Sequence, residues 1–139
     1  MRTRTLFVIL VAGGVLLAGC NGDGDTGPSD GVSDDPSFAQ DLQPVFDNRC
    51  ATQQCHGDAE QAGLSLVDGE AYGELVLTQS TSEPEYFRVM PGAPDSSYLV
   101  IKIEGNQSVG SRMPLTGGPL DSDTIQLIRN WILAGAQDN

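Results

Sequence analysis

Two cysteines and a histidine stand together in residues 49–57, which read RCATQQCHG. Cys50 and Cys55 are separated by four residues, and His56, the one histidine among 139 residues, follows at once. Two thiols beside an imidazole are typical of covalent haem attachment, although the usual motif has two residues between the cysteines. The same residues could instead form a disulfide beside a surface histidine, or part of a metal site. The rest of the chain would fold around a haem, a disulfide or a metal ion, depending on which alternative holds.

The first nineteen residues predict an export signal that is not part of the fold. Arg2 and Arg4 are basic, and residues 6–18 are apolar; this run suits a signal peptide and is short of the ~20 residues that a membrane-spanning helix needs. Residues 17–20 read LAGC, which resembles the lipobox of bacterial lipoproteins. The resemblance implies that Cys20 carries lipid and begins the mature chain, the alternative being an ordinary cleaved signal. We therefore expect a lipid anchor in a bacterial cell envelope, with the chain exposed to the periplasm or the cell exterior.

Residues 20–37 are expected to form a lipidated, acidic tether without fixed structure. Residues 21–37 contain five Asp and four Gly and almost no apolar side chain, so ordering them would bury too little surface. Without the signal the chain has five Lys or Arg against nineteen Asp or Glu, a net charge of −14. Such a chain repels nucleic acid, and basic protein surfaces suit it better as partners, but the charge is explained equally well by solubility and names no partner by itself.

Residues 38–139 are expected to form one mainly helical domain. A helix is predicted to begin at Phe38, since residues 37–40 have the form of a capping box. Pro44 either kinks this helix or, as we expect, lies in the first turn of a second segment that runs to Cys50. Shorter helices are predicted over residues 70–77 and 96–104, the latter capped by Asp95 and ended by Gly105.

The last helix has the clearest pattern. Asp121 or Ser122 is its predicted cap and Gly135 follows its end. One apolar face contains Ile125, Ile128, Trp131 and Ile132. Between the helices lie long Gly- and Pro-rich loops, so the apolar core is thin for about a hundred residues and something besides side chains is expected to fill its centre.

A haem group would fill that centre and use the cysteine segment. A histidine directly after the second cysteine can lie beneath the iron, while extra residues between the cysteines loop outward. A thioether would complete the His/Met ligation that suits electron carriers. Met113 and Met90 both precede proline, which favours a loop; Met113 is the predicted distal ligand and Met90 the fallback, and either could instead fill the core.

Two arginines are weaker candidates for the same site. Arg112, next to Met113, and Arg88 could pair with haem propionates, but each is more often a solvated surface charge.

Five segments, in this order, resemble the small monohaem c-type cytochrome domain of planctomycete and myxobacterial envelope proteins: FAQDLQPVFDNRCATQQCHG, AGLSL, PGAPDSSYLVIKI, SRMPLTGGPL and IQLIRNWILAGA. They cover most of residues 38–139. The resemblance implies a mainly α, cytochrome c-like fold of class I, with long Gly- and Pro-rich loops around one covalently bound haem c. The helices at the two ends would cross near the haem, with Phe46 and Trp131 packed at the crossing.

The same resemblance implies a role for each candidate site residue. Cys50 and Cys55 are thioether positions, His56 is the proximal iron ligand and Met113 the distal one. The four-residue spacing of the cysteines departs from the common pattern. The function implied is electron transfer to redox partner proteins with basic docking surfaces. The chain is then a carrier, alone or as a redox subunit of a larger complex, and no enzyme itself.

Two alternatives remain at this point. The first is a binding lipoprotein without haem, in which a Cys50–Cys55 disulfide closes a tight loop. The second is a copper or zinc protein of the envelope that uses Cys50, Cys55, His56 and Met113 as ligands.

Overall fold

The computed structural model describes residues 31–139; the expected signal segment, Cys20 and most of the expected tether lie outside the described residues. The described chain is mainly helical and has no strand. Its helical segments are η1 (Phe38–Leu42), α1 (Gln43–Arg49), η2 (Gln61–Gly63), α2 (Ala71–Leu75), η3 (Pro94–Ser96), α3 (Tyr98–Glu104) and α4 (Ser122–Leu133). None of these helices is long and apolar enough to cross a membrane. The predicted helical class is therefore confirmed for this part of the chain.

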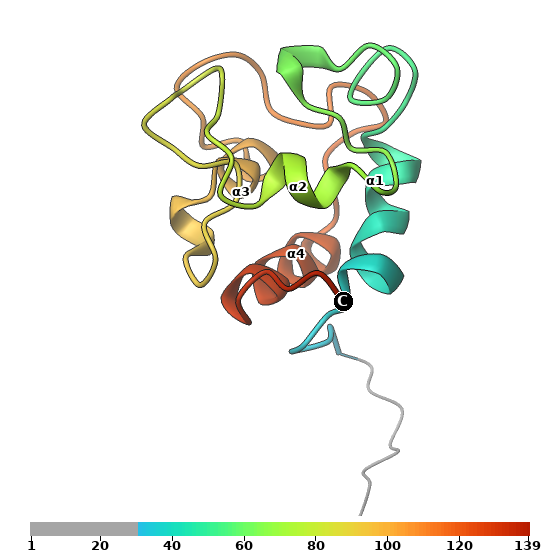
Figure 1. Cartoon of the computed structure of the whole chain (residues 1–139), viewed down its shortest axis with the longest axis vertical. Coiled ribbons are helices and arrows are strands. Elements are labelled where there is room, and N and C mark those ends of the chain that lie inside the picture. Colours follow the sequence, from blue (N-terminus) through green and yellow to red (C-terminus); the bar gives the residue numbers. More distant parts are fainter. Residues whose placement is uncertain (1–30) are drawn as a thin grey trace, which may run out of the picture.

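The molecule has a helical end and a loop end (Figure 1). The last helix, α4, lies beside the start of the η1–α1 run, and the C-terminus ends next to that start. The long connections between α1 and α2, and between α3 and α4, gather at the opposite end. The first of these connections contains His56 and the second contains Met113, so the candidate site residues lie at the loop end.

The first two segments form one helical run around Pro44. Ser37 Oγ accepts a hydrogen bond from the Gln40 N–H at 3.2 Å, as the capping prediction requires. The Ser37 N–H, however, donates to Asp41 Oδ2 at 2.8 Å rather than to the Gln40 side chain. Pro44 has no N–H and its ring crowds the preceding turn, and the helix accommodates it with a wider π turn over η1.

The middle helices are shorter than predicted. The segment predicted over residues 70–77 is helical only as α2. The helix α3 begins at Tyr98, and the side chain of its cap residue, Ser97, bonds to residues before the helix rather than capping it. Asp95, the predicted cap, instead accepts a hydrogen bond from Arg129 of α4 at 2.5 Å. Gly105 ends α3 with a φ of +85°, as predicted.

The last helix agrees with its prediction throughout. Asp121 Oδ1 accepts a hydrogen bond from the Thr124 N–H at 2.8 Å. Ile128, Trp131 and Ile132 are buried and Ile125 packs against them. Gly135 follows the helix with a φ of +109°.

Aromatic rings join the two ends of the chain. The Phe38 ring lies between those of Phe46 and Trp131, with centroid distances of 6.0 and 5.3 Å. Tyr72 of α2 meets Phe38 edge-on at 5.3 Å, and its hydroxyl donates to the Ala136 carbonyl. Phe46 and Trp131 therefore pack at the contact of the terminal helices, with Phe38 between them. This contact lies at the helical end, opposite the candidate site residues, whereas the predicted crossing was to lie near the haem site.

The packed part of the chain begins before Phe38. Pro36 is fully buried, and Asn130 Nδ2 of α4 donates to the Ser33 carbonyl at 2.8 Å. These residues fall in the segment assigned to the tether. The polar composition of that segment does not predict its contact with α4, because only one proline and one backbone carbonyl make that contact.

Candidate functional site

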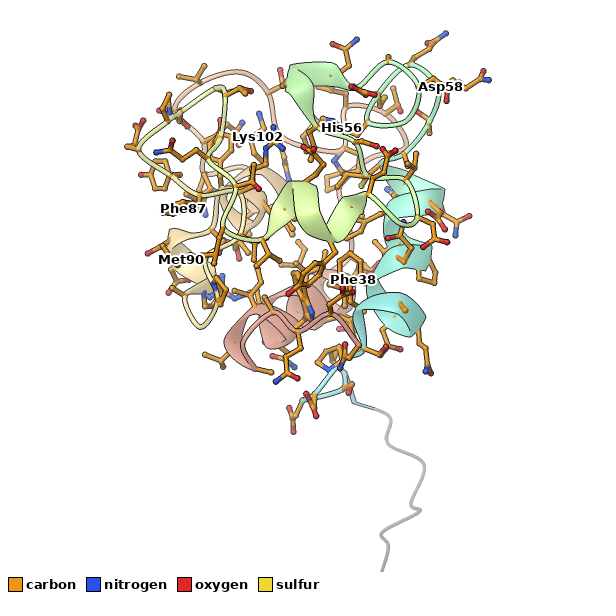
Figure 2. The ribbon with its side chains drawn as sticks, in the orientation of Figure 1. Phe38, His56, Asp58, Phe87, Met90 and Lys102 are labelled. Carbon is orange, nitrogen blue, oxygen red and sulfur yellow. The ribbon has the colours of Figure 1, made fainter. Side chains whose placement is uncertain are left out.

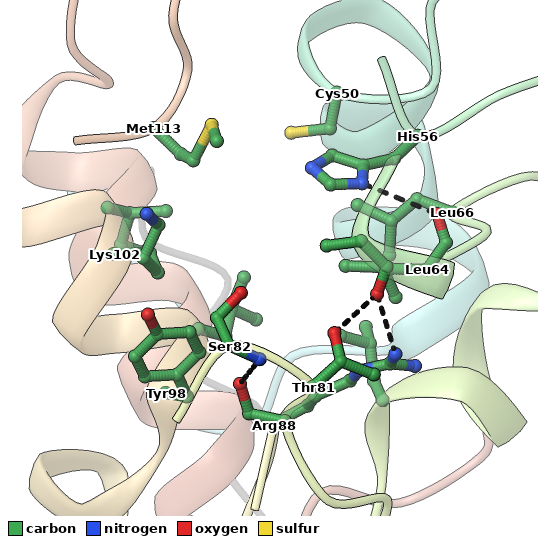
Figure 3. A pocket seen from close by; sticks show the side chains of 15 residues that line it. Cys50, His56, Leu64, Leu66, Thr81, Ser82, Arg88, Tyr98, Lys102 and Met113 are labelled. Atoms are coloured by element: carbon green, nitrogen blue, oxygen red, sulfur yellow. Dashed lines mark hydrogen bonds between the residues drawn. The ribbon is translucent and has the colours of Figure 1, made fainter. Parts of the chain in front are cut away.

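A cavity opens at the loop end, between the end of α1 and the start of the segment that follows α3 (Figure 3). Its inner part has a volume of about 120 Å³ and its outer part about 390 Å³. Cys50, His56, Ala62 and Met113 line both parts. The outer part alone lies at the lower end of the range of 300–1,000 Å³ that is typical of cofactor pockets. His56 and Met113 face each other across this space.

One ring nitrogen of His56 is bound to the backbone and the other faces the cavity (Figure 3). His56 Nδ1 lies 3.3 Å from the Leu64 carbonyl oxygen. Burial lowers the pKa of His56 below its usual 6.5, so the imidazole is neutral at pH 7. A neutral imidazole that donates Nδ1–H to a carbonyl keeps the Nε2 lone pair for a metal ion.

The four residues between the cysteines form an outward loop. The His56 N–H donates to the Cys50 carbonyl at 3.1 Å, and the Cys55 N–H donates to the Thr52 carbonyl at 2.9 Å. Residues 52–54 are exposed. The loop thus returns His56 to the end of α1 despite the longer spacing.

The two thiols differ in environment. The Cys50 sulfur points into the cavity, and burial raises the pKa of this thiol to about 11. Cys55 lines only the outer part of the cavity. Both are free thiols, so the disulfide alternative is not formed in this structure.

Of the two candidate methionines, Met113 alone lies at the cavity. The Met113 N–H donates to the Lys102 carbonyl at 2.9 Å, which ties the loop of Met113 to α3. Met90 lies near η3, away from His56 (Figure 2), and its backbone N–H donates a hydrogen bond to Ser97 Oγ at 2.9 Å. Met90 lines neither part of the cavity.

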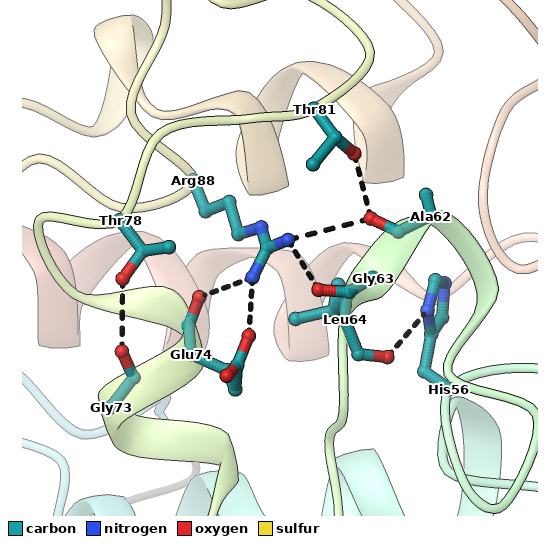
Figure 4. A network of polar contacts seen from close by, with 9 residues as sticks. All are labelled: His56, Ala62, Gly63, Leu64, Gly73, Glu74, Thr78, Thr81 and Arg88. Atoms are coloured by element: carbon teal, nitrogen blue, oxygen red, sulfur yellow. Dashed lines mark hydrogen bonds and ion pairs between the residues drawn. The ribbon is translucent and has the colours of Figure 1, made fainter.

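Neither candidate arginine is a solvated surface charge. Arg88 is only 6% exposed, and its guanidinium binds the Glu74 carboxylate at 2.7 Å and the Gly63 carbonyl at 2.6 Å (Figure 4). Arg112 Nε donates to the Ile103 carbonyl at 2.8 Å. Both side chains are therefore committed to the protein.

Polar residues that the sequence analysis did not single out gather at the inner end of the cavity. The Tyr98 side chain is buried, and its hydroxyl has no hydrogen-bond partner among the described residues. Burial and the nearby Glu83 carboxylate raise the pKa of Tyr98 to about 12, so the phenol keeps its proton. Lys102 Nζ lies 5.9 Å from the Tyr98 ring centroid and donates to the Ser111 carbonyl. Tyr98 and Lys102 are four residues apart in a predicted helix, and this spacing indicates that they lie on the same face.

The walls between the two ends of the cavity are apolar. They are formed by Leu64, Leu66, Leu75, Leu99 and Ile103. A ligand with a broad apolar body and an acidic edge would therefore find a complementary surface here.

A conventional metal cluster is absent from residues 31–139, because no three His, Cys, Asp or Glu side chains converge on one point there. No family model, curated protein or solved structure matches the chain.

Proposed function

We propose that the domain binds one haem c through Cys50 and Cys55, with His56 and Met113 as axial iron ligands, and carries electrons in the bacterial cell envelope. The observation that carries the proposal is that His56 faces Met113 across a cavity into which the Cys50 thiol also points. When bound, haem supplies reversible one-electron chemistry at its iron.

The lining of the cavity fits this group. Apolar walls suit the macrocycle, and the Tyr98 hydroxyl, which lies beside the Glu83 carboxylate, is a hydrogen-bond donor at the inner end. Lys102, also at that end, supplies a positive charge. A carboxylate buried here would need such a donor and cation to replace its water.

The chain's own residues favour a carrier over an enzyme. Burial keeps His56 neutral, the Leu64 carbonyl orients its ring, and the backbone bond of Met113 to α3 holds Met113 opposite. If His56 and Met113 both held the iron, no position on it would be left open for a substrate. The protein would then bury the group and limit access of water to it.

Retention of haem after denaturation tests the proposal. The chain is expressed with a c-type maturation system, denatured and run on a gel stained for haem. We expect haem to stay with the polypeptide, and to be lost in the Cys50→Ala/Cys55→Ala variant. Loss of haem from the unchanged chain on denaturation would contradict covalent attachment, and a chain that never takes up haem would favour the disulfide-closed lipoprotein.

A pair of methionine variants tests the distal ligand. Met113→Ala should abolish the sulfur-to-iron charge-transfer band of the ferric protein, whereas Met90→Ala should keep it, because Met90 is outside the cavity. The opposite outcome would make Met90 the ligand.

The proposed lipid anchor is tested separately. Cys20→Ser should move the protein from the membrane fraction to the soluble fraction without loss of haem, since the anchor and the haem site use different cysteines. A variant that stays in the membrane fraction would exclude Cys20 as the anchor.

A further inference from the structure

The segment that precedes Leu64 has an unfavourable backbone. Glu60 and Ala62 have φ values of +43° and +60°, in the left-handed region that residues with a side chain rarely adopt. Gly63 follows with a φ of +62°. Since residue 64 provides the carbonyl that binds His56 Nδ1, the position of this acceptor depends on how the strained segment is held.

Side chains from outside the segment hold its carbonyls in place (Figure 4). Arg88 Nη2 donates to the Gly63 carbonyl at 2.6 Å and reaches the Ala62 carbonyl at 3.4 Å. Thr81 Oγ1 donates to the same Ala62 carbonyl at 2.7 Å. Two consecutive carbonyls directly before Leu64 are thus fixed from one side.

The Arg88 guanidinium is itself anchored on α2. Its Nη1 donates to the Glu74 carboxylate at 2.7 Å and to the Glu74 main-chain carbonyl at 2.8 Å. The planar fork of arginine can meet all these acceptors at once, which the single ammonium of lysine cannot. We call this unit the Arg88 clamp: Arg88, Glu74 and the carbonyls of residues 62 and 63.

We propose that the Arg88 clamp positions His56 for iron binding, by holding the Leu64 carbonyl where it accepts the Nδ1 proton. This role rests on the proposed function, in which His56 is the proximal ligand. Arg88 is a positioning residue that acts through the backbone, because its Nη donors bind Glu74 and residues 62–63 rather than His56. A firm carbonyl acceptor fixes the ring orientation and makes the imidazole a stronger electron donor to the metal.

The test uses the one histidine of the chain, since its ring protons give a single set of NMR signals. The exchange rate of the His56 Nδ1 proton with solvent is measured in the reduced, haem-loaded protein, together with the reduction potential. Arg88→Lys keeps the charge and loses the fork, and Glu74→Gln keeps the shape and loses the charge.

We expect about tenfold faster exchange of the Nδ1 proton in both variants, because the acceptor is no longer held. In Arg88→Lys, which preserves the charge, the potential should also rise, since a less basic imidazole stabilises ferric iron less well. The matched control is Arg129→Lys, which removes a fork that binds Asp95 at 2.5 Å and Glu104 at 2.9 Å without contact to the His56 loop. This control should exchange like the unchanged protein.

If folded Arg88→Lys and Glu74→Gln had the Nδ1 exchange rate of the unchanged protein, and Arg88→Lys also had its reduction potential, the inference would be overturned. Faster exchange in the Arg129 control as well would also overturn it, because the effect would then be one of general stability. If no haem is retained by the unchanged chain, the proposed function fails. The exchange rates of the haem-free variants would still decide whether the clamp holds His56.

Discussion

The residue after His56 leaves no room for a side chain. A Cβ at Gly57 would lie 2.6 Å from the Ala51 carbonyl oxygen and 2.9 Å from that of Thr52. Both are backbone atoms of the loop between the cysteines, so relief requires the loop to move. We expect Gly57→Ala to lower the free energy of unfolding by about 1–3 kcal/mol, measured by denaturant titration, and to reduce haem incorporation.

A second glycine provides the control for that experiment. Gly73, within α2, has no atom within 4 Å of an added Cβ and has no positive φ. Gly73→Ala should raise stability by about 0.5–1 kcal/mol, because alanine favours a helix and restricts the unfolded chain. Equal losses in the two variants would show that the space at Gly57 is not the cause.

The single histidine also makes stability depend on pH. Burial lowers the pKa of His56 in the folded protein below 6.5, so between that lowered value and 6.5 the unfolded chain binds more protons. The contribution of neutral His56 to stability is therefore complete above about pH 6.5 and is lost as the pH falls below it. Denaturant titrations of the haem-free chain from pH 7.5 to 5.5 should show this slope, and His56→Gln should remove it.

Helix ends could be predicted from the sequence where the bonding is local. Asp121 caps α4 through residues three positions away, and Gly105 ends α3 through its own backbone. Asp95 has equally good local chemistry for a cap, yet it binds Arg129, 34 residues later in the chain. A tertiary ion pair of that kind has no signature in the local pattern, which explains why this prediction was wrong.

The cap of α4 can be tested with a matched pair of variants. Asp121 accepts bonds from the N–H and the hydroxyl of Thr124, both at 2.8 Å. Asp121→Ala should lower the denaturation midpoint, whereas Asp121→Asn should keep most of the stability, because asparagine also accepts the Thr124 N–H bond.

The same bonds lower the pKa of Asp121 below 3.8. The charge of Asp121 therefore contributes to stability above pH 3.8, and this contribution is lost as the pH falls through the lowered value.

At the scale of the whole molecule, the sequence predicted which residues meet but not what supports them. His56 of the cysteine segment and Met113 of the Met-Pro loop line one cavity, although 57 residues separate them in the sequence. Arg88 and Tyr98 take roles that the sequence did not reveal. The acceptors of Arg88 are mostly main-chain carbonyls, and a carbonyl is present at every position whatever its side chain.

The two ends of the molecule should also respond differently to haem. The aromatic cluster of Phe38, Phe46, Tyr72 and Trp131 packs the helical end without any contribution from the cavity. The loops at the other end, residues 51–66 and 106–118, contain few buried side chains and surround the cavity. Their amides should therefore open more readily when the cavity is unfilled.

Hydrogen exchange followed by mass spectrometry can compare the haem-loaded protein with the Cys50→Ala/Cys55→Ala chain prepared without haem. We expect protection to increase mainly in residues 51–66 and 106–118, and to change little in η1 and α4. This pattern follows because a bound group stabilises most the segments that it contacts, while helices packed on one another keep their own stability. Equal gains in the helices and the loops would contradict it, and would mean that the aromatic cluster depends on haem to fold.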